Sequence, residues 1–345
     1  MRDCMKTIAM CALLAALAFG LLPGNRDEAA ASDAGLVLLV ETREEAEAPR
    51  KAASAQQNES EATMTQTAPD SQTVRLLDDG VVAEISMEDY LTGVLLSEMP
   101  ADFETEARKA QAVAARTFTC RKLLQPKHEN ADVCAEASCC QAWTSREQLR
   151  QKYGASFDTV WSAAREAVRQ TAGEVLTYDG QLIDAVYFSC SGGATEAAVA
   201  VWGTDVPYLQ AVESPGEEAA PRFSSRAVFS PEEFSQRLMQ ENPDVQLSGS
   251  PDAWLGETTR SAGGGAATCS IGGVSFSGTQ LRRMFGLNST RLTLSYQDGD
   301  FVFDVTGFGH RVGMSQYGAQ TMARLGFSYR TILQYYYQGA EVERQ

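Results

Sequence analysis

The stretch of sequence that decides the fold runs Ser86-Met-Glu-Asp-Tyr-Leu-Thr-Gly-Val-Leu-Leu-Ser-Glu-Met-Pro100. Ser86, followed three residues later by Asp89, is typical of a helix N-terminus, and Pro100 cannot continue a helix. Between them, five residues share one helical stripe: Tyr90, Leu91, Val94, Leu95 and Glu98. The spacing therefore predicts a helix over residues 86–99 that carries one carboxylate on its apolar face.

A carboxylate at Glu98 is costly to ionise in that position. Partial burial and the negative end of the helix dipole both disfavour the charged form, so we expect a raised pKa. A general acid that works near neutral pH requires such a pKa. The spacing alone favours the alternative, an exposed glutamate in the last helical turn.

The next predicted helix covers residues 104–124 and is rich in alanine. Lys109, Val113 and Arg116 fall on one face of it. That face is either a solvated charged surface or a cationic wall opposite an anionic or carbonyl-bearing ligand. The alanines on the other faces indicate a closely packed helix, which favours the second interpretation.

Further helices are predicted at residues 156–171 and 315–325, and short strands near residues 74–85, 174–188 and 292–305. This order indicates an α+β fold of mixed helices and short strands in one domain over residues 74–342. Residues 215–290 are a candidate inserted lobe, to which no role is assigned. Ser230 before Pro231 is typical of a helix start within it.

The composition and the N-terminal segment limit the class of protein. The chain has 345 residues, 44% of them hydrophobic, and a net charge of −16, which excludes wholesale disorder and disfavours nucleic-acid binding. An uncharged run over residues 7–25 follows Arg2 and Lys6, so residues 1–28 are a signal anchor or a cleaved signal peptide. Residues 29–73 have the composition of a linker. We expect the remainder of the chain to lie outside the cytoplasm.

Two later motifs carry candidate binding residues. Tyr187-Phe188-Ser189-Cys190-Ser191-Gly192-Gly193 follows a predicted strand and suits close approach of the backbone to sugar hydroxyls, or is an ordinary turn. Residues 307–319 surround His310 with glycines, and a histidine in such a loop is either structural or part of a site. Four aromatic residues are candidates for stacking on sugars or for the core: Tyr187, Trp202, Tyr208 and Tyr317.

Six cysteines lie beyond the N-terminal segment: Cys120, Cys134, Cys139, Cys140, Cys190 and Cys269. Three of them fall within residues 134–140, a density more typical of a metal site than of a disulfide framework. A disulfide from Cys134 to one of the adjacent pair is the main alternative. The spacing assigns no role to Cys120, Cys190 or Cys269.

Four stretches of the sequence are distinctive when taken in order: residues 88–100, Lys109-Ala-Gln-Ala-Val-Ala-Ala-Arg-Thr117, the turn at 187–193 with Trp202, and Gly307-Phe-Gly-His-Arg-Val-Gly-Met-Ser-Gln-Tyr-Gly-Ala319. Together they resemble the stage II sporulation protein D family. The domain of that family also occurs in amidase-enhancer proteins. The resemblance implies a peptidoglycan lytic transglycosylase, acting on denuded glycan strands, in which Glu98 is both general acid and general base. It also implies a set of substrate-binding residues: Lys109, Gln111, Arg116, Tyr187, Ser189, Ser191, Gly192, His310, Gln316 and Tyr317.

The resemblance extends to the cysteines, because some family members hold zinc with a Cys-x4-His-Cys cluster. Here Cys139 stands at the histidine position, so Cys134, Cys139 and Cys140 are the expected ligands. His128, water or a substrate group would complete the set. The zinc would be structural or would position substrate.

The same resemblance implies a role in engulfment during sporulation, with one N-terminal anchor in the cell membrane and the catalytic domain facing the septal wall. Expected partners are peptidoglycan, stage II sporulation protein P and stage II sporulation protein M. A rival function is a non-catalytic wall-binding module that activates an amidase. A metal-dependent hydrolase that uses the cysteine cluster is a third, weaker reading.

Overall fold

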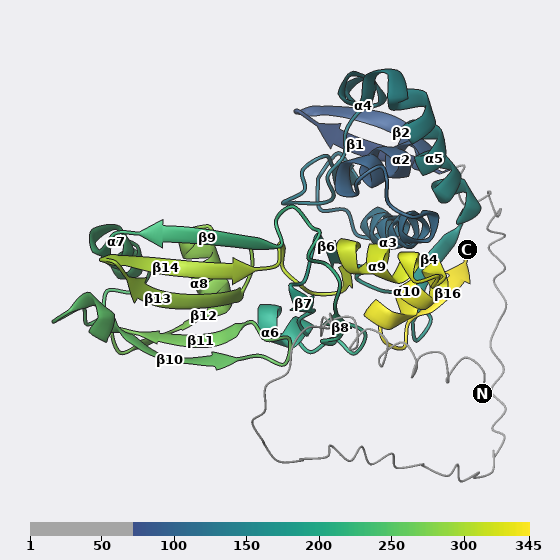
Figure 1. Cartoon of the computed structure of the whole chain (residues 1–345). Helices are drawn as coiled ribbons and strands as arrows, with labels where there is room; N and C mark the ends of the chain where they lie inside the picture. The colour runs from purple at the N-terminus through teal and green to yellow at the C-terminus, as the bar shows by residue number, and fades with distance from the viewer. Residues whose placement is uncertain (1–71) are drawn as a thin grey trace, which may run out of the picture. The chain divides into compact units, whose positions relative to one another are not determined.

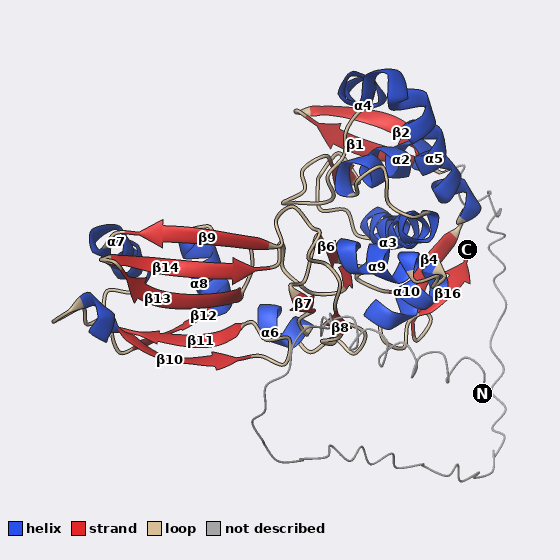
Figure 2. Ribbon diagram, viewed as in Figure 1, coloured by secondary structure: helices blue, strands red, loops and turns tan. Residues whose placement is uncertain are grey.

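The computed structural model describes residues 72–345, and it is an α+β structure, as predicted (Figures 1 and 2). The expected signal segment at residues 1–28 and most of the expected linker at 29–73 lie outside the described residues. Among the residues described, no helix is long and apolar enough to cross a membrane.

Helices make up much of the described chain. They are α2 (Met87–Glu98), α3 (Thr105–Leu124), α4 (Arg146–Tyr153), α5 (Phe157–Gln170), α6 (Ala198–Trp202), α7 (Pro231–Glu241), α8 (Gly278–Phe285), α9 (Gln316–Arg324) and α10 (Tyr329–Tyr336), with the 3-10 helices η1 (Gly154–Ser156) and η2 (Pro251–Trp254).

The strands are short and belong to separate small sheets. They are β1 (Thr73–Asp78), β2 (Val81–Ser86), β3 (Val133–Cys134), β4 (Glu174–Tyr178), β5 (Gln181–Leu182), β6 (Tyr187–Phe188), β7 (Gly193–Ala194), β8 (Glu213–Ser214), β9 (Ser224–Phe229), β10 (Leu255–Arg260), β11 (Ala266–Ile271), β12 (Val274–Ser277), β13 (Arg291–Gln297), β14 (Asp300–Thr306), β15 (Met314–Ser315) and β16 (Glu341–Arg344). Their orders are β2-β1-β3, β10-β11-β12, β13-β14-β9, β16-β4-β5, β15-β6 and β7-β8.

Local sequence signals account for where the predicted helices begin. Helix α2 starts after Ser86, whose side chain accepts a hydrogen bond from the Asp89 backbone N–H at 3.1 Å. Helix α7 starts at Pro231 with a complete capping box from Ser230, as its sequence indicated. The predictions of helices at 86–99, 104–124, 156–171 and 315–325 are therefore confirmed within one or two residues at each end.

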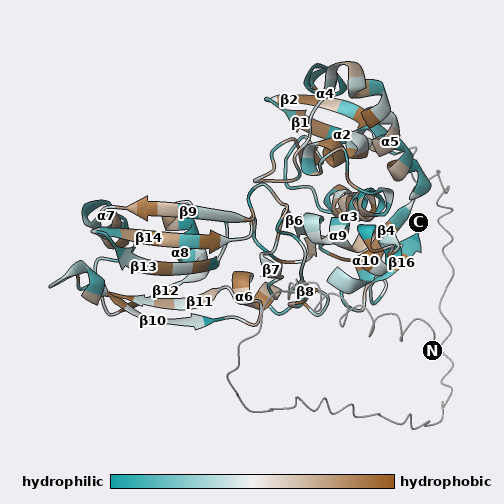
Figure 3. Cartoon of the chain, in the orientation of Figure 1, coloured by the Kyte–Doolittle hydropathy of each residue, from teal (hydrophilic) through white to brown (hydrophobic). Residues whose placement is uncertain are grey.

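The first hydrophobic core surrounds α3. This helix contacts α2, α5, α9, α10 and β4, so elements from both ends of the described chain pack on it. Close packing is possible because its buried positions carry small side chains: Ala107, Ala110, Ala112, Ala114 and Ala115. Figure 3 shows the hydrophobic residues of α2 and α3.

A second core fills the candidate lobe. Strands β9, β14 and β13 lie side by side (Figure 1). Phe234 of α7 stacks on Phe301 of β14 with ring centroids 3.8 Å apart. Helix α8 packs on β11 and β12. This core continues past residue 290, the end expected from the sequence, because β13 and β14 complete its sheet.

One buried arginine connects the two cores. Arg311 donates to Glu196 Oε1 at 3.0 Å, to the Ala194 and Ser191 carbonyls at 2.7 Å each, and to the Gly263 carbonyl at 2.6 Å. Glu196 also accepts from the Gly265 N–H at 2.9 Å. The side chains of Arg311 and Glu196 are 0% and 2% exposed, so water does not compensate if either is removed.

We expect Arg311→Met to lower the free energy of unfolding by about 3–5 kcal/mol, because Glu196 is then left charged, buried and unpaired. Arg226→Met is the matched control. Its pair with Asp304 has side chains 55% and 56% exposed, and such pairs contribute about 0–1 kcal/mol. Urea unfolding of both variants measures the difference, and equal losses would contradict a structural role for the Arg311 pair.

Candidate functional site

Glu98 is the last residue of α2, and its carboxylate turns into the protein. Oε1 accepts a hydrogen bond from the Ala142 backbone N–H at 2.8 Å, and Oε2 accepts one from the Gln316 amide at 3.2 Å. Burial raises the pKa of Glu98, and these two donors offset the rise only in part. The pKa of Glu98 is therefore raised, as predicted, and neither of its two hydrogen-bond donors carries a charge.

A buried amide lies next to this carboxylate. Gln141 accepts from the Tyr187 hydroxyl at 2.7 Å and donates to the Tyr90 hydroxyl at 3.2 Å and to Thr119 Oγ1 at 3.1 Å. Burial raises the pKa of Tyr187 well above its ordinary value, and the charge of Glu98 adds to the rise. Tyr187 therefore stays protonated near Glu98. Gln141 and Ala142 are not among the residues predicted from the sequence, where their only signal is that they follow Cys140.

Two residues at the start of α9, Gln316 and Tyr317, also contact residues of this site. Gln316 donates to Glu98, and the Tyr317 N–H donates to the Ser189 carbonyl at 3.0 Å. The Tyr317 ring packs edge-on against Phe103, with centroids 5.0 Å apart. The structure thus brings together four of the residues expected at the site: Glu98, Tyr187, Gln316 and Ser189.

The turn at residues 189–193 is held from inside the protein. Ser191 is fully buried, and its hydroxyl donates to Glu217 at 2.8 Å. Gly192 has a φ of +77°, and an added Cβ would lie 3.0 Å from the Gly307 backbone. In this structure Ser191 and Gly192 therefore shape the turn, while Ser189 is the partly exposed member.

Both ring nitrogens of His310 form hydrogen bonds with backbone groups. Nε2 donates to the Tyr187 carbonyl at 3.0 Å, and Nδ1 accepts from the Val312 N–H at 3.1 Å. Burial lowers the pKa of His310 to about 4, so the ring is neutral at pH 7. In this arrangement His310 supports the Tyr187 backbone, and a sugar contact through its nitrogens would break one of these bonds.

The prediction that Arg116 forms part of a cationic wall on α3 is wrong. Its side chain is buried and donates to the Val168 carbonyl at 2.9 Å and the Glu174 carbonyl at 3.3 Å, which ties α3 to α5 and β4. Lys109 is partly exposed and pairs with Glu106 at 2.8 Å. Gln111 is buried on the same helix near the Tyr187 hydroxyl, but neither its amide oxygen nor its amide nitrogen has a hydrogen-bond partner among the described residues.

The remaining candidate aromatics differ in exposure. Tyr208 accepts from the Asp184 N–H at 3.1 Å and packs on Tyr178, so it is structural. Helix α6 is hydrophobic (Figure 3). Trp202 at its end is 48% exposed. Its ring lies 5.5 Å from that of His310.

The cysteine cluster lies immediately before the segment that contacts Glu98. The side-chain donor atoms of His128, Cys134, Cys139 and Cys140 all lie within 4.8 Å of one another, so these four residues could hold a metal ion. Lys127 donates to the Cys139 sulfur at 3.1 Å and lowers its pKa, whereas burial raises the pKa of Cys140 to about 12. None of the six cysteines in the described part of the chain forms a disulfide.

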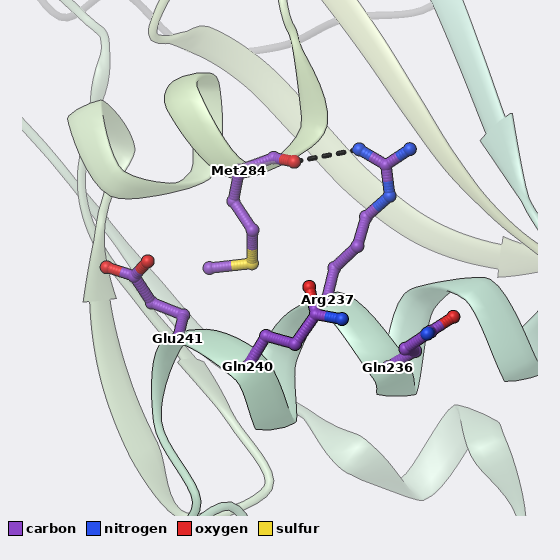
Figure 4. A pocket seen from close by; sticks show the side chains of 5 residues that line it. All are labelled: Gln236, Arg237, Gln240, Glu241 and Met284. Carbon is purple, nitrogen blue, oxygen red and sulfur yellow. Dashed lines mark hydrogen bonds between the residues drawn. The ribbon is translucent and has the colours of Figure 1, made fainter.

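A polar hollow in the lobe involves none of these residues. Figure 4 shows it on α7, where Arg237 donates to the Met284 carbonyl at 2.8 Å. Its lining residues are Gln236, Arg237, Gln240, Glu241 and Met284.

Comparison with known proteins finds one family model and several relatives. The family model described as "Stage II sporulation protein" matches residues 78–178, which include Glu98 and the cysteine cluster. Stage II sporulation protein D of Bacillus subtilis (strain 168) is 38% identical over 76% of this chain and 75% of its own length, and the protein of the same name from Bacillus amyloliquefaciens is 37% identical over the same shares. The amidase enhancer of Bacillus subtilis (strain 168) is 30% identical over 72% of this chain and 39% of its own length. The chain therefore belongs to the stage II sporulation protein D family.

Proposed function

We propose that the protein is a lytic transglycosylase that cleaves the MurNAc–GlcNAc linkage of denuded peptidoglycan strands during sporulation. The observation that carries this proposal is the partly buried Glu98, whose hydrogen-bond partners are the neutral donors Ala142 and Gln316. Among the described residues, no second carboxylate is hydrogen-bonded within the cluster of Glu98, Gln141, Tyr187 and Gln316. Ordinary glycosidases need two carboxylates, whereas this reaction needs one.

The reaction uses Glu98 twice. The protonated acid donates its proton to the glycosidic oxygen as the bond from that oxygen to C1 of MurNAc breaks. The resulting Glu98 carboxylate then takes the proton of the C6 hydroxyl, and the C6 oxygen bonds to C1. The product is a 1,6-anhydro end, no water is consumed, and Glu98 returns to its protonated form.

The surroundings of Glu98 suit both steps. Burial favours the protonated form that the first step needs, and the Ala142 and Gln316 donors stabilise the carboxylate formed midway. Ser189, Tyr317 and the exposed Trp202 are then the residues that we assign to contact with sugar, with Lys109 at the edge.

The proposal also covers location and partners. The protein would be held in the cell membrane by its N-terminal segment, with the domain facing the septal wall, and would act with stage II sporulation proteins P and M. Prior removal of stem peptides by an amidase would supply the denuded strands.

A second candidate function is a non-catalytic, wall-binding module that activates an amidase. The relative named amidase enhancer favours it. An activator would tolerate the loss of the Glu98 acid, which gives a direct way to separate the two functions.

We further propose that the ion held by His128, Cys134, Cys139 and Cys140 is zinc. Three thiolates and one imidazole form a closed tetrahedral set of the kind found at structural zinc sites. The segment that follows supplies Gln141 and Ala142, so a bound ion would fix the loop that contacts Glu98. A closed set leaves no position for a metal-bound nucleophile.

Glu98→Gln is expected to lower the formation of anhydro ends from denuded strands by about 10²–10⁴-fold, because an amide cannot transfer the proton. Mass spectrometry of the digestion products measures it. The matched control is Glu241→Gln, which also replaces the last residue of a helix and is expected to leave the rate unchanged. Full activity in the Glu98 variant would contradict the acid/base role, and no product from the wild type, with strand binding retained, would favour the activator module.

The rate should fall as pH rises through the raised pKa of Glu98, since only the protonated acid can protonate the leaving oxygen. Gln316→Leu removes a donor that lowers this pKa, so its alkaline limb should move to higher pH. The midpoint of the pH–rate profile measures this independently of the maximal rate. An unmoved midpoint would mean that Glu98 does not control the limb.

Protein purified without chelator should contain about one zinc ion per chain. Cys140→Ser should lower this content and the melting temperature, whereas Cys269→Ala, which changes a buried cysteine of the second core, should keep the zinc. Atomic emission and thermal unfolding are the measurements. A chain without stoichiometric zinc would remove the case for the metal.

A further inference from the structure

Glu217 is a buried carboxylate that the proposed reaction does not use. It lies in the loop between β8 and β9 and is 1% exposed. Within the described residues it has no ion-pair partner, and burial raises its pKa. A carboxylate in that setting is costly to bury unless hydrogen bonds compensate.

Five donors from three segments converge on Glu217. Oε2 accepts from the Ser191 N–H at 2.5 Å, the Ser191 hydroxyl at 2.8 Å and the Gly192 N–H at 3.0 Å. Oε1 accepts from the Ser214 hydroxyl at 2.6 Å and the Ser315 hydroxyl at 2.5 Å. One side chain therefore joins the turn at 189–193, the end of β8 and the start of α9.

The contacts of Glu217 are connected to Glu98 through the start of α9. Ser315 is the N-cap of α9, where its hydroxyl also accepts from the Gly318 N–H at 3.2 Å. The next residue, Gln316, donates to Glu98, and Tyr317 donates to Ser189 of the turn. A shift of Ser315 would move the Gln316 amide away from the Glu98 carboxylate.

We propose that Glu217 is a positioning residue: through Ser315 it sets Gln316 against Glu98, and through Ser191 and Gly192 it holds the turn that faces the substrate. The proposal rests on the proposed function in that it takes Glu98 as the catalytic acid. Glu217 itself touches neither the substrate nor Glu98. Its carboxylate is suited to this role because it accepts from backbone N–H groups on one oxygen and from hydroxyls on the other.

The test compares Glu217→Gln with Glu218→Gln, which changes the exposed neighbouring residue. Glu217→Gln is expected to lower kcat for anhydro-end formation by about 10²-fold, as for a misplaced catalytic group, while Glu218→Gln leaves it unchanged. Because one of its two routes passes through Gln316, Glu217→Gln should lower kcat by a smaller factor in a Gln316→Leu background than in the wild type. Losses that multiply in the double variant would overturn the link.

A second pair of variants keeps the proposal testable if Glu217→Gln folds poorly. Ser315→Ala removes the hydroxyl that joins Glu217 to α9, whereas Ser315→Thr retains it. We expect Ser315→Ala to lower kcat and Ser315→Thr to restore most of it. Equal activity of the alanine and threonine variants would contradict the proposal.

Hydrogen exchange separates this proposal from the proposed function. A neutral amide holds the Ser191 and Gly192 N–H groups less tightly than a carboxylate does, so Glu217→Gln should speed exchange there and at Gly318, and Glu218→Gln should not. Unchanged exchange would overturn the positioning role even if the wild type cleaves glycan. A wild type without activity would refute the proposed function and leave the exchange result to decide the role of Glu217.

Discussion

Close packing around α3 is the constraint on which the rest of the structure depends. Its alanines allow α2, α5, α9, α10 and β4 to approach one helix. Glu98 ends α2 and Gln316 begins α9, so these two side chains meet only because both helices pack on α3. A larger side chain at one of the buried alanines would move whole helices, and with them the polar groups that they carry.

The candidate site is built from one charge and several neutral groups. A cation beside Glu98 would hold its pKa down, and the buried arginine of α3 is instead used by the carbonyls of α5 and β4. The polar groups around the carboxylate are instead neutral: the amides of Gln141 and Gln316 and the hydroxyl of Tyr187. They form hydrogen bonds without favouring the charged form of Glu98 as strongly as a cation would. Such an arrangement suits a group that must gain and lose a proton within one reaction.

The sequence was sufficient for the positions set by local periodicity. The capping signal at Ser86 and the stop at Pro100 give α2, whereas the apolar stripe alone did not decide whether the Glu98 side chain lies inward or in solvent. Periodicity also shows which residues share a face of α3, but it does not show which neighbour covers that face, and Arg116 was misplaced for this reason. Gln141 has no such signal, because it lies in an irregular loop whose path depends on contacts with Tyr90 and Tyr187.

The glycine-rich motifs show why a motif residue need not touch a ligand. In residues 307–319, Arg311 joins the two cores, His310 holds the Tyr187 backbone and Ser315 caps α9, and of these residues only Gln316 contacts Glu98. The glycines allow the backbone to pass close to the turn at 189–193, where Gly307 would clash with Ser191 if it carried a Cβ. A site assembled from segments so far apart in sequence needs such internal contacts. In the described chain, neither the turn at 189–193 nor the start of α9 is held by a long strand or a disulfide. The motif is therefore best understood as the part that positions the donor to the Glu98 carboxylate, and in the proposed function the chemistry is carried by α2.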